Sequence, residues 1–321
     1  MNAPRTRVQR RPVHGVLLLD KPLGLSSNDA LQKAKWLLRA EKAGHTGTLD
    51  PLATGVLPLC FGAATKFSQI HLDADKTYEA VLRLGIRTTT ADAEGEVIAE
   101  RPVAHTAEQL AEVLRRFTGV IRQVPPMHSA LKKDGRALYE YARAGVDVER
   151  EAREVEIYRL ELLDSVEKWP FPTIRIRVSC SKGTYIRTLG EDIGEALGCG
   201  AHLASLRRIA TGPFGLDRCV TLATLEAMDE AQREACLLPV ATLLTRHSPV
   251  SLSAPDAARF LSGVRRRGAW PDQTQVAVHG PDGSLLGTAQ VRAGELIPTR
   301  LLNPMEIDQI LKTLPPTLCA A

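Results

Sequence analysis

Strict alternation of side chains in two segments places the strongest limit on how this chain folds. In residues 76–84, KTYEAVLRL, and in residues 173–180, TIRIRVSC, every second side chain is apolar and the intervening ones are mostly polar. A period of two is typical of a β-strand with one face on a core and the other in solvent. Strand-like stretches recur at hairpin-length spacings and outnumber convincing crossover helices. We therefore predict an α+β fold with a mixed, largely antiparallel sheet, not a Rossmann fold.

Amphipathic helices are expected between these strands. Their apolar spacing is helical in residues 26–40, 106–118 and 184–198. The second of them opens with a capping box, Thr106 and Gln109. Residues 125–152 differ, because a Pro-Pro pair, a basic turn and a tyrosine-rich helix follow one another there. This segment is predicted to be an insertion that leaves the core.

A second unit is expected near the Ser/Pro-rich stretch at residues 246–256. Short strand patterns separated by Gly and Pro-Asp-Gly turns follow it. The predicted organisation is a flexible basic arm (1–13), a catalytic domain (14–245), a small β-rich domain (247–315) and a tail (316–321).

The charge of the chain is concentrated in the arm. The formal net charge is +4, and the first twelve residues hold four arginines and no acid, so the remaining 41 − 4 = 37 bases balance 37 acids. Such an arm suits contact with a polyanion or a simple solvated tail, and both interpretations stay open. No stretch of about 18 apolar residues predicts a membrane span. The six cysteines form no C-x-x-C pair, which favours a reducing, cytoplasmic setting.

The segment GHTGTLDPLATG, residues 44–55, is the most suggestive candidate site. It holds one carboxylate, Asp50, among three glycines, and Pro51 favours an extended backbone at Asp50. A structural turn and a catalytic carboxylate remain equally good interpretations of this spacing. A metal site from His45 and Asp50 is less favoured, because no second cluster of ligands is present.

Read together, several motifs resemble the TruB family, the bacterial tRNA pseudouridine-55 synthases. The resemblance covers about residues 14–245 and is carried in order by LLLDKPLGLSSNDAL, GHTGTLDPLATGVLPLCFGAATK, DKTYEAVLRLG, RTTTADAEGEV, QVPPMHSALKKDGRALYEYAR and CSKGTYIRTLGEDIGEALGCGAHLASLRR. It implies a pseudouridine synthase catalytic domain and a PUA-like C-terminal domain that binds RNA. The implied reaction isomerises a tRNA uridine without a cofactor or metal.

The resemblance also assigns roles by motif position. Asp50 matches the essential carboxylate, Tyr78 the tyrosine that stacks on the flipped uracil, and Arg187 the arginine that pairs with the carboxylate. A core aromatic remains the alternative for Tyr78. The implied pocket and RNA contacts are His45, which displaces flipped bases, Tyr185 and Leu206 in the pocket, Lys21 and Asp92 near it, and Lys132, Lys133 and Arg136 on the insertion.

One departure from the family and two alternative functions complete the prediction. His128 stands where the family's insertion motif has a tyrosine, which affects loop contacts. The expected partner is the T stem-loop of tRNA, bound by a monomer in the cytoplasm without a membrane or a guide RNA. The full-length insertion argues against a guide-dependent enzyme. The other alternative is an RNA-binding tRNA folding factor whose role does not depend on catalysis.

Overall fold

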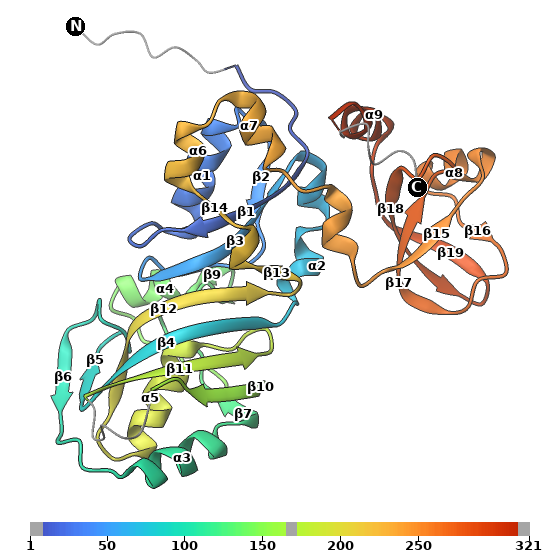
Figure 1. Ribbon diagram of the computed structural model, residues 1–321. Helices are drawn as coiled ribbons and strands as arrows, with labels where there is room; N and C mark the ends of the chain where they lie inside the picture. The colour runs from blue at the N-terminus through green and yellow to red at the C-terminus, as the bar shows by residue number, and fades with distance from the viewer. Residues whose placement is uncertain (1–8, 165–171, 314–321) are drawn as a thin grey trace, which may run out of the picture.

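A ten-stranded mixed sheet forms the larger part of the molecule, as Figure 1 shows. The structure, a computed structural model, describes residues 9–164 and 172–313. In spatial order the strands are β14 (Val220–Thr221), β1 (Gly15–Lys21), β3 (Ala53–Phe61), β12 (Ala201–Thr211), β4 (Lys76–Leu84), β11 (Thr173–Cys180), β10 (Arg153–Leu162) and β7 (Gly119–Gln123), with β2 (Ala43–His45) beside β3 and β13 (Phe214–Gly215) beside β12. Only the β1–β14 and β3–β12 pairs are parallel. The predicted mixed, largely antiparallel sheet is confirmed.

The central strands alternate as their sequences require. In β4, buried residues at every second position face one way, and Tyr78 is opposite Val178 of β11. On its other side β4 pairs with β12, where Arg208 is opposite Tyr78 and Leu206 is opposite Ala80. Tyr78, Leu206 and Arg208 therefore belong to the same face of the sheet, which positions the site described below.

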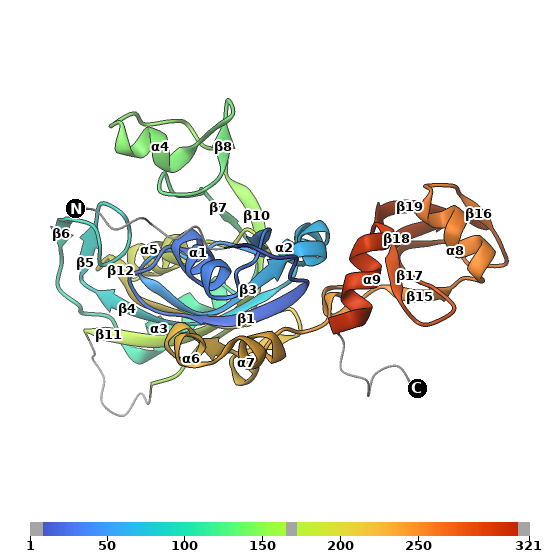
Figure 2. The ribbon, with the colours of Figure 1, turned by 90° about the horizontal axis from the view of Figure 1, so that it is seen from above.

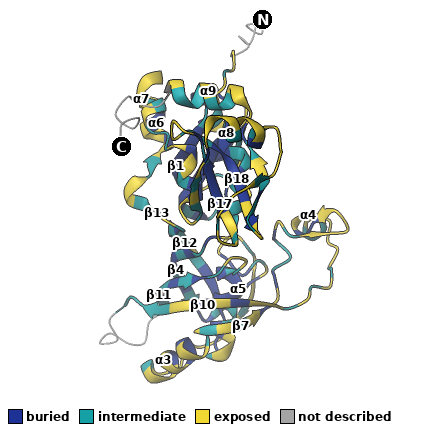
Figure 3. Ribbon diagram, turned by 90° about the vertical axis from the view of Figure 1, so that its right-hand side faces the viewer, coloured by how far each residue is buried: buried dark blue, intermediate teal, exposed yellow. Residues whose placement is uncertain are grey.

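Helices cover that face with one apolar cluster, and the buried strand centres are visible in Figure 3. They are α1 (Ser27–Leu37), α3 (Ala107–Arg116), α5 (Ile186–Ala196) and α6 (Leu222–Ala227). Ser26 caps α1 by accepting from the Asp29 N–H, and the predicted capping box of Thr106 and Gln109 begins α3. The helices thus begin where their sequence signals stand.

Shorter elements surround the sheet. These are the 3₁₀ helices η1 (Gly62–Lys66), η3 (Leu216–Arg218) and η4 (Val240–Leu244), the helices α2 (Ser68–Leu72) and α7 (Glu230–Ala235), and the strand pair β5 (Ile86–Thr88) and β6 (Val97–Glu100). The segment predicted to be an insertion carries β8 (Lys132–Lys133), β9 (Arg136–Ala137) and α4 (Leu138–Arg143). Figure 2 shows that α4 and β8 stand away from the sheet.

A five-stranded sheet forms the C-terminal part. Its order is β15 (Ser248–Ser251), β17 (Gln273–His279), β18 (Leu285–Arg292), β19 (Glu295–Leu301) and β16 (Arg266–Arg267), and the helices α8 (Ala254–Leu261) and α9 (Pro304–Thr313) accompany it. The Ser/Pro-rich stretch expected as a joint forms β15, which pairs in parallel with β17. This stretch therefore belongs to the second sheet itself.

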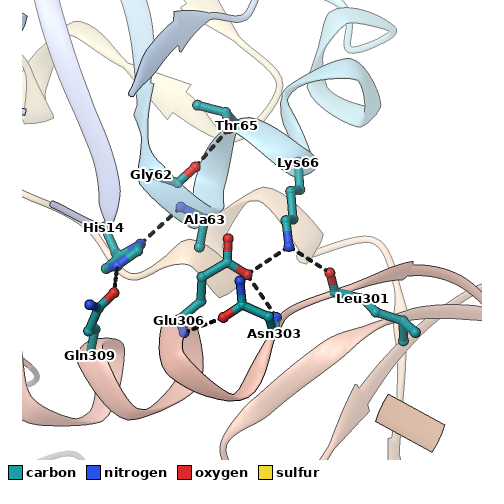
Figure 4. A network of polar contacts seen from close by, with 9 residues as sticks. All are labelled: His14, Gly62, Ala63, Thr65, Lys66, Leu301, Asn303, Glu306 and Gln309. Atoms are coloured by element: carbon teal, nitrogen blue, oxygen red, sulfur yellow. Dashed lines mark hydrogen bonds and ion pairs between the residues drawn. The ribbon is translucent and has the colours of Figure 1, made fainter. Parts of the chain in front are cut away.

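The two parts meet through α9, as Figure 4 shows. Lys66 Nζ lies 2.7 Å from Glu306 Oε2 and donates to the Leu301 carbonyl at 2.9 Å. His14 Nε2 and Gln309 Oε1 are 2.8 Å apart, and His14 Nδ1 accepts from the Ala63 N–H. Below these contacts, one apolar cluster joins residues of β1 and β3 to residues of β17 and α9. The C-terminal part is therefore packed on the larger sheet.

Part of the basic arm contacts the protein itself. Arg10 Nη1 donates to the Ala40 carbonyl at 3.0 Å, and Arg11 makes ion pairs with Glu230 and Glu234. Arg5 and Arg7 of the arm and the tail at 316–321 lie outside the described residues. No helix in the described part of the chain is long and apolar enough to cross a membrane.

Candidate active site

The loop that carries Asp50 is fixed by hydrogen bonds to two other segments. The Leu49 N–H donates to Ser27 Oγ at 2.7 Å, and Ser27 Oγ donates back to the Leu49 carbonyl at 3.0 Å. The Gly24 N–H donates to the Pro51 carbonyl at 2.9 Å. The start of α1 and the turn after β1 therefore hold the residues on both sides of Asp50.

Asp50 is one of two carboxylates that share a buried guanidinium. Arg187, in the first turn of α5, places Nη2 3.0 Å from Asp50 Oδ2 and Nη1 3.5 Å from Asp92 Oδ2. The side chains of Arg187 and Asp92 are 7% and 4% exposed, whereas that of Asp50 is 40% exposed. Of the two carboxylates, Asp50 is thus the one that can reach a substrate.

Burial and charge act in opposite directions on Asp50. Loss of solvation raises the pKa of its carboxyl above the usual value of 3.8, and the nearby charge of Asp92 adds to the rise. The Arg187 guanidinium opposes it, as do the weaker charges of Lys21 and His128. Arg187 therefore limits the rise in the pKa of Asp50 and favours its ionised form.

Asp92 is positioned by its own turn. Its Oδ1 accepts from Thr90 Oγ1 at 2.5 Å and from the Glu94 N–H at 3.0 Å. Only 3% of the surface of Asp92 is exposed, so this turn is buried at its acidic residue.

The charge of Asp50 acts on the hydroxyls of both Tyr78 and Tyr185. Tyr78 is buried on β4, and burial raises the pKa of its hydroxyl. Tyr185 precedes α5, and the Gln123 side chain holds its backbone N–H at 3.0 Å and its carbonyl at 3.3 Å. A cavity of about 380 Å³ opens beside Tyr185, and its lining includes Gln123 and Arg153. Leu206 packs half-buried against the apolar cluster of this face.

Lys21 and His45 flank the same loop. Lys21 is fully buried at the end of β1, where its ammonium donates to the carbonyls of Pro22 and Leu25 at 2.9 and 2.6 Å. Burial lowers the pKa of Lys21 to about 8, against the opposing charge of Asp50. His45 ends β2, and burial lowers its pKa as well, which favours the neutral imidazole.

The cations proposed for the insertion are placed apart from this site. Lys132, Lys133 and Arg136 are exposed on the β8–β9 hairpin. Lys133 Nζ donates to the Glu149 carbonyl at 2.8 Å, and Arg136 pairs with Glu140 while it stacks on the Tyr141 ring. The root of the insertion does reach the site, because Arg187 Nη2 donates to the His128 carbonyl at 2.7 Å.

Three parts of the site were not predicted from the sequence: Gln123, the backbone of His128, and Arg208. The first two act through main-chain contacts, for which a sequence carries no signal. Arg208 did have a signal, because in a strand of alternating faces two adjacent arginines must point to opposite sides. Arg207 pairs with Asp20 at 2.7 Å, and Arg208 is buried on the other face.

Two other kinds of site, a second hollow and a metal centre, find no support among the described residues. A hollow of about 690 Å³ between α3 and the end of α5 contains none of the predicted residues. Within residues 9–164 and 172–313, no group of three or more His, Cys, Asp or Glu side chains is placed to hold a metal ion.

Solved structures with the same architecture define the class of this protein. The crystal structure of a Cbf5-Nop10-Gar1 complex matches with a TM-score of 0.67 and 26% identity over 92% of this chain and 87% of that chain. An archaeal box H/ACA sRNP Nop10-Cbf5 complex has the same fold, with a TM-score of 0.67 over 94% of this chain and 88% of its own, at 24% identity. The fold is that of a pseudouridine synthase, with a curled, PUA-like C-terminal sheet.

Sequence relatives identify the family. The model of the TruB family pseudouridylate synthase N-terminal domain matches residues 35–186, and two TruB C-terminal models match residues 187–245 and 248–302. A tRNA pseudouridine synthase B of Verminephrobacter eiseniae is 64% identical over 98% of this chain and 96% of its own. Another, of Ralstonia nicotianae, is 63% identical over 92% and 96%. The chain belongs to the TruB family of pseudouridylate synthases.

Proposed function

We propose that this enzyme converts uridine-55 in the T loop of tRNA into pseudouridine. The observation that carries the proposal is the ion pair of Asp50 with the buried Arg187, because it combines a partly exposed carboxylate with a guanidinium that favours its ionised form. Relatives with more than 60% identity are named as tRNA pseudouridine synthases, which supports tRNA as the substrate.

The reaction rearranges one nucleotide without adding or removing atoms. The bond from C1′ to N1 breaks, the uracil rotates in the pocket, and C5 bonds to C1′. The C5–H bond then breaks, its electron pair forms the C5–C6 double bond, and N1 gains a proton. Asp50 is the essential carboxylate, either attacking C1′ or acting as a base at the sugar. Both roles require the ionised form, which the Arg187 guanidinium favours.

The other side chains hold the extruded base. A uridine inside a folded RNA must leave its stack before chemistry can reach it. Tyr78 stacks on the uracil and takes part in the proton transfer from C5, while Tyr185 and Leu206 enclose the base. His45 occupies the space that the base leaves in the RNA. Lys21 holds the turn after β1, and Asp92 holds Arg187, since both side chains are buried and bonded to other residues of the protein.

RNA binding extends beyond the site in this proposal. The exposed Lys132, Lys133 and Arg136 contact phosphates, which position an RNA without reading its sequence. Residues 14–245 form the catalytic domain, and residues 247–315 form the RNA-binding PUA-like domain. The enzyme acts as a monomer without a guide RNA. Its five free cysteines in the described residues suit the reducing cytoplasm.

Tritium release from a T-arm minihelix that carries 5-tritiated uridine tests the function. Wild type should release tritium, whereas Asp50→Asn should release none and still bind the RNA. An absence of release by wild type from the minihelix and from full-length tRNA would overturn the enzymatic proposal. Retained binding in that case would leave a tRNA folding factor. A requirement for added RNA would instead indicate a guide-dependent enzyme.

A further inference from the structure

Arg208 is a buried cation without a carboxylate partner in the described part of the chain. Its surface is 1% exposed, and it lies on the site face of β12. Its Nε donates to the Val56 carbonyl at 2.7 Å, and its Nη2 reaches the Gly47 carbonyl at 3.4 Å. A buried charge without an anionic partner is costly, so this arrangement calls for a role beyond stability.

The two carbonyls lie on both sides of the catalytic loop. Gly47 precedes Asp50 by three residues and Val56 follows it by six, so one guanidinium ties together the two ends of the loop. The main chain of Arg208 also touches this loop. A Cβ added at Gly55, whose φ is +103°, would lie 2.1 Å from the Arg208 carbonyl oxygen. Glycine is therefore required where β12 and the loop meet.

Arg208 also faces Tyr78, its neighbour across the β4–β12 pair. Burial raises the pKa of the Tyr78 hydroxyl, and Arg208 opposes that rise through its charge and a hydrogen bond. Two other groups face this hydroxyl: Cys180 on β11, a thiol whose own pKa is raised to about 11 by burial, and Asp50. Both raise the pKa of Tyr78, so among these three groups only Arg208 favours its phenolate form.

We infer that Arg208 is a positioning residue of the reaction, which ties the Asp50 loop to Tyr78 and prepares the Tyr78 oxygen to accept the proton from C5. The inference rests on the proposed function. In the last step the Tyr78 phenolate takes the C5 proton, the electron pair of that bond forms the C5–C6 double bond, and N1 is protonated by water. The Tyr78 phenol afterwards returns its proton to water, so no other reactant is needed.

Several further ionisable groups surround Arg208 and limit how its loss can be interpreted. Its charge lowers the pKa values of Lys21 on β1, His45 on β2, His71 on α2 and Lys76 on β4. For all four, burial is the larger cause. Removal of Arg208 therefore moves these four pKa values upward together with that of Tyr78. A readout specific to the C5–H bond is needed to separate Tyr78 from them.

The test compares Arg208→Gln with Arg207→Gln. Arg207 is the next residue, lies on the opposite face and pairs with Asp20, so its variant is a matched control. Each protein is assayed on a minihelix with hydrogen or deuterium at C5 of the target uridine. For Arg208→Gln we expect kcat to fall about 100-fold, the contribution typical of general base catalysis. We also expect a larger deuterium isotope effect on kcat.

Arg208→Lys separates charge from geometry. A lysine keeps the positive charge near Tyr78, but one ammonium cannot replace a fork that reaches two carbonyls. It should keep the wild-type isotope effect, with kcat lowered about tenfold by the looser loop. If Arg208→Gln does not fold, the kcat of Arg208→Lys tests the inference alone.

Three outcomes would overturn the inference. The first is an Arg208→Gln variant that matches Arg207→Gln. The second is an Arg208→Gln variant with a lower melting temperature and an unchanged isotope effect, because its role would then be only structural. The third is an Arg208→Lys variant with wild-type kcat. Failure of the proposed function is distinct, since wild type itself would then release no tritium.

Discussion

Cations in the candidate active site are buried, whereas cations on the insertion are exposed. In the site, Lys21, Arg187 and Arg208 are buried, and carbonyl or carboxylate oxygens of the protein surround them. On the insertion, Lys132 and Lys133 are exposed on a two-stranded hairpin that stands away from the sheet (Figure 2). Both groups are positively charged, yet only the second is exposed to solvent.

The difference shows how one chain divides recognition from chemistry. A buried cation is weakly screened by salt and fixes the geometry of its partners. An exposed cation contributes little to the fold, but it attracts a polyanion in a way that salt weakens. Substitutions in the site should therefore change kcat, and substitutions on the insertion should change KM and its salt dependence.

The largest effect is expected from Arg187→Gln. This variant leaves Asp92 buried without its cation and removes the partner that favours the ionised form of Asp50. We expect kcat/KM to fall at least about 100-fold, a loss of about 3 kcal/mol of transition-state stabilisation. Arg101→Gln is the control, since Arg101 pairs with Glu195 on the surface. Single-turnover kinetics check the prediction, and a change in KM alone would contradict it.

Acid inactivation is the next effect. Because the pKa of Asp50 is raised, the carboxylate is protonated at a higher pH than an ordinary aspartate would be. Activity should therefore fall about tenfold per pH unit below that value.

The effect of this raised pKa on folding stability has the opposite sign. A raised carboxyl pKa favours folding at low pH, and this contribution is lost as the pH rises through the folded-state value. Asp50→Asn should thus melt no earlier than wild type at pH 7, and an earlier transition would refute this account of burial.

A smaller effect is expected from the double variant Lys132→Gln, Lys133→Gln. KM should rise while kcat stays unchanged, and the slope of log binding constant against log salt should decrease by about 0.7 to 0.9 for each phosphate that the protein no longer neutralises. Arg115→Gln, an exposed cation on α3, should leave the slope unchanged. Identical slopes for wild type and the double variant would assign the RNA contacts to another surface.

The smallest effect concerns the contact between the two sheets. Lys66→Gln removes the pair with Glu306, whose side chain is 16% exposed, and should lower the melting temperature by about 2–4 °C, as a loss of about 1 kcal/mol does in a domain of this size. Lys312→Gln breaks an exposed pair within α9 and should change it by less. Equal effects of the two variants would mean that the contact in Figure 4 does not stabilise the molecule.

Local patterns accounted for much of the fold. Alternation predicted β4 and β11, and a capping box predicted the start of α3, because these signals act within a few residues. Strand β15 was expected as a joint, because its pairing with β17 joins residues that are 28 positions apart in the chain. The helix α9 was not predicted. Its residues bond to Lys66 and His14, which are distant in the sequence, so no local pattern indicates this helix.

The same distinction holds for the site. Asp50, Tyr78 and Arg187 could be nominated because each stands in a recognisable motif, but no local pattern shows that Arg187 also bonds to Asp92 and to the His128 carbonyl. Arg208 lacked a motif role, and its burial follows only from the pairing of β12 with β3 and β4. Residues that act through main-chain atoms need the three-dimensional arrangement.

One nitrogen atom, Nη2 of Arg187, serves both the Asp50 carboxylate and the His128 carbonyl at the root of the insertion. An RNA that fits poorly and lifts this root would withdraw one of the oxygens that orient the guanidinium, and the carboxylate would lose its alignment as well. Discrimination between RNAs would then operate on the rate of the chemical step rather than on affinity. A wrong RNA could occupy the enzyme and still leave it unmodified.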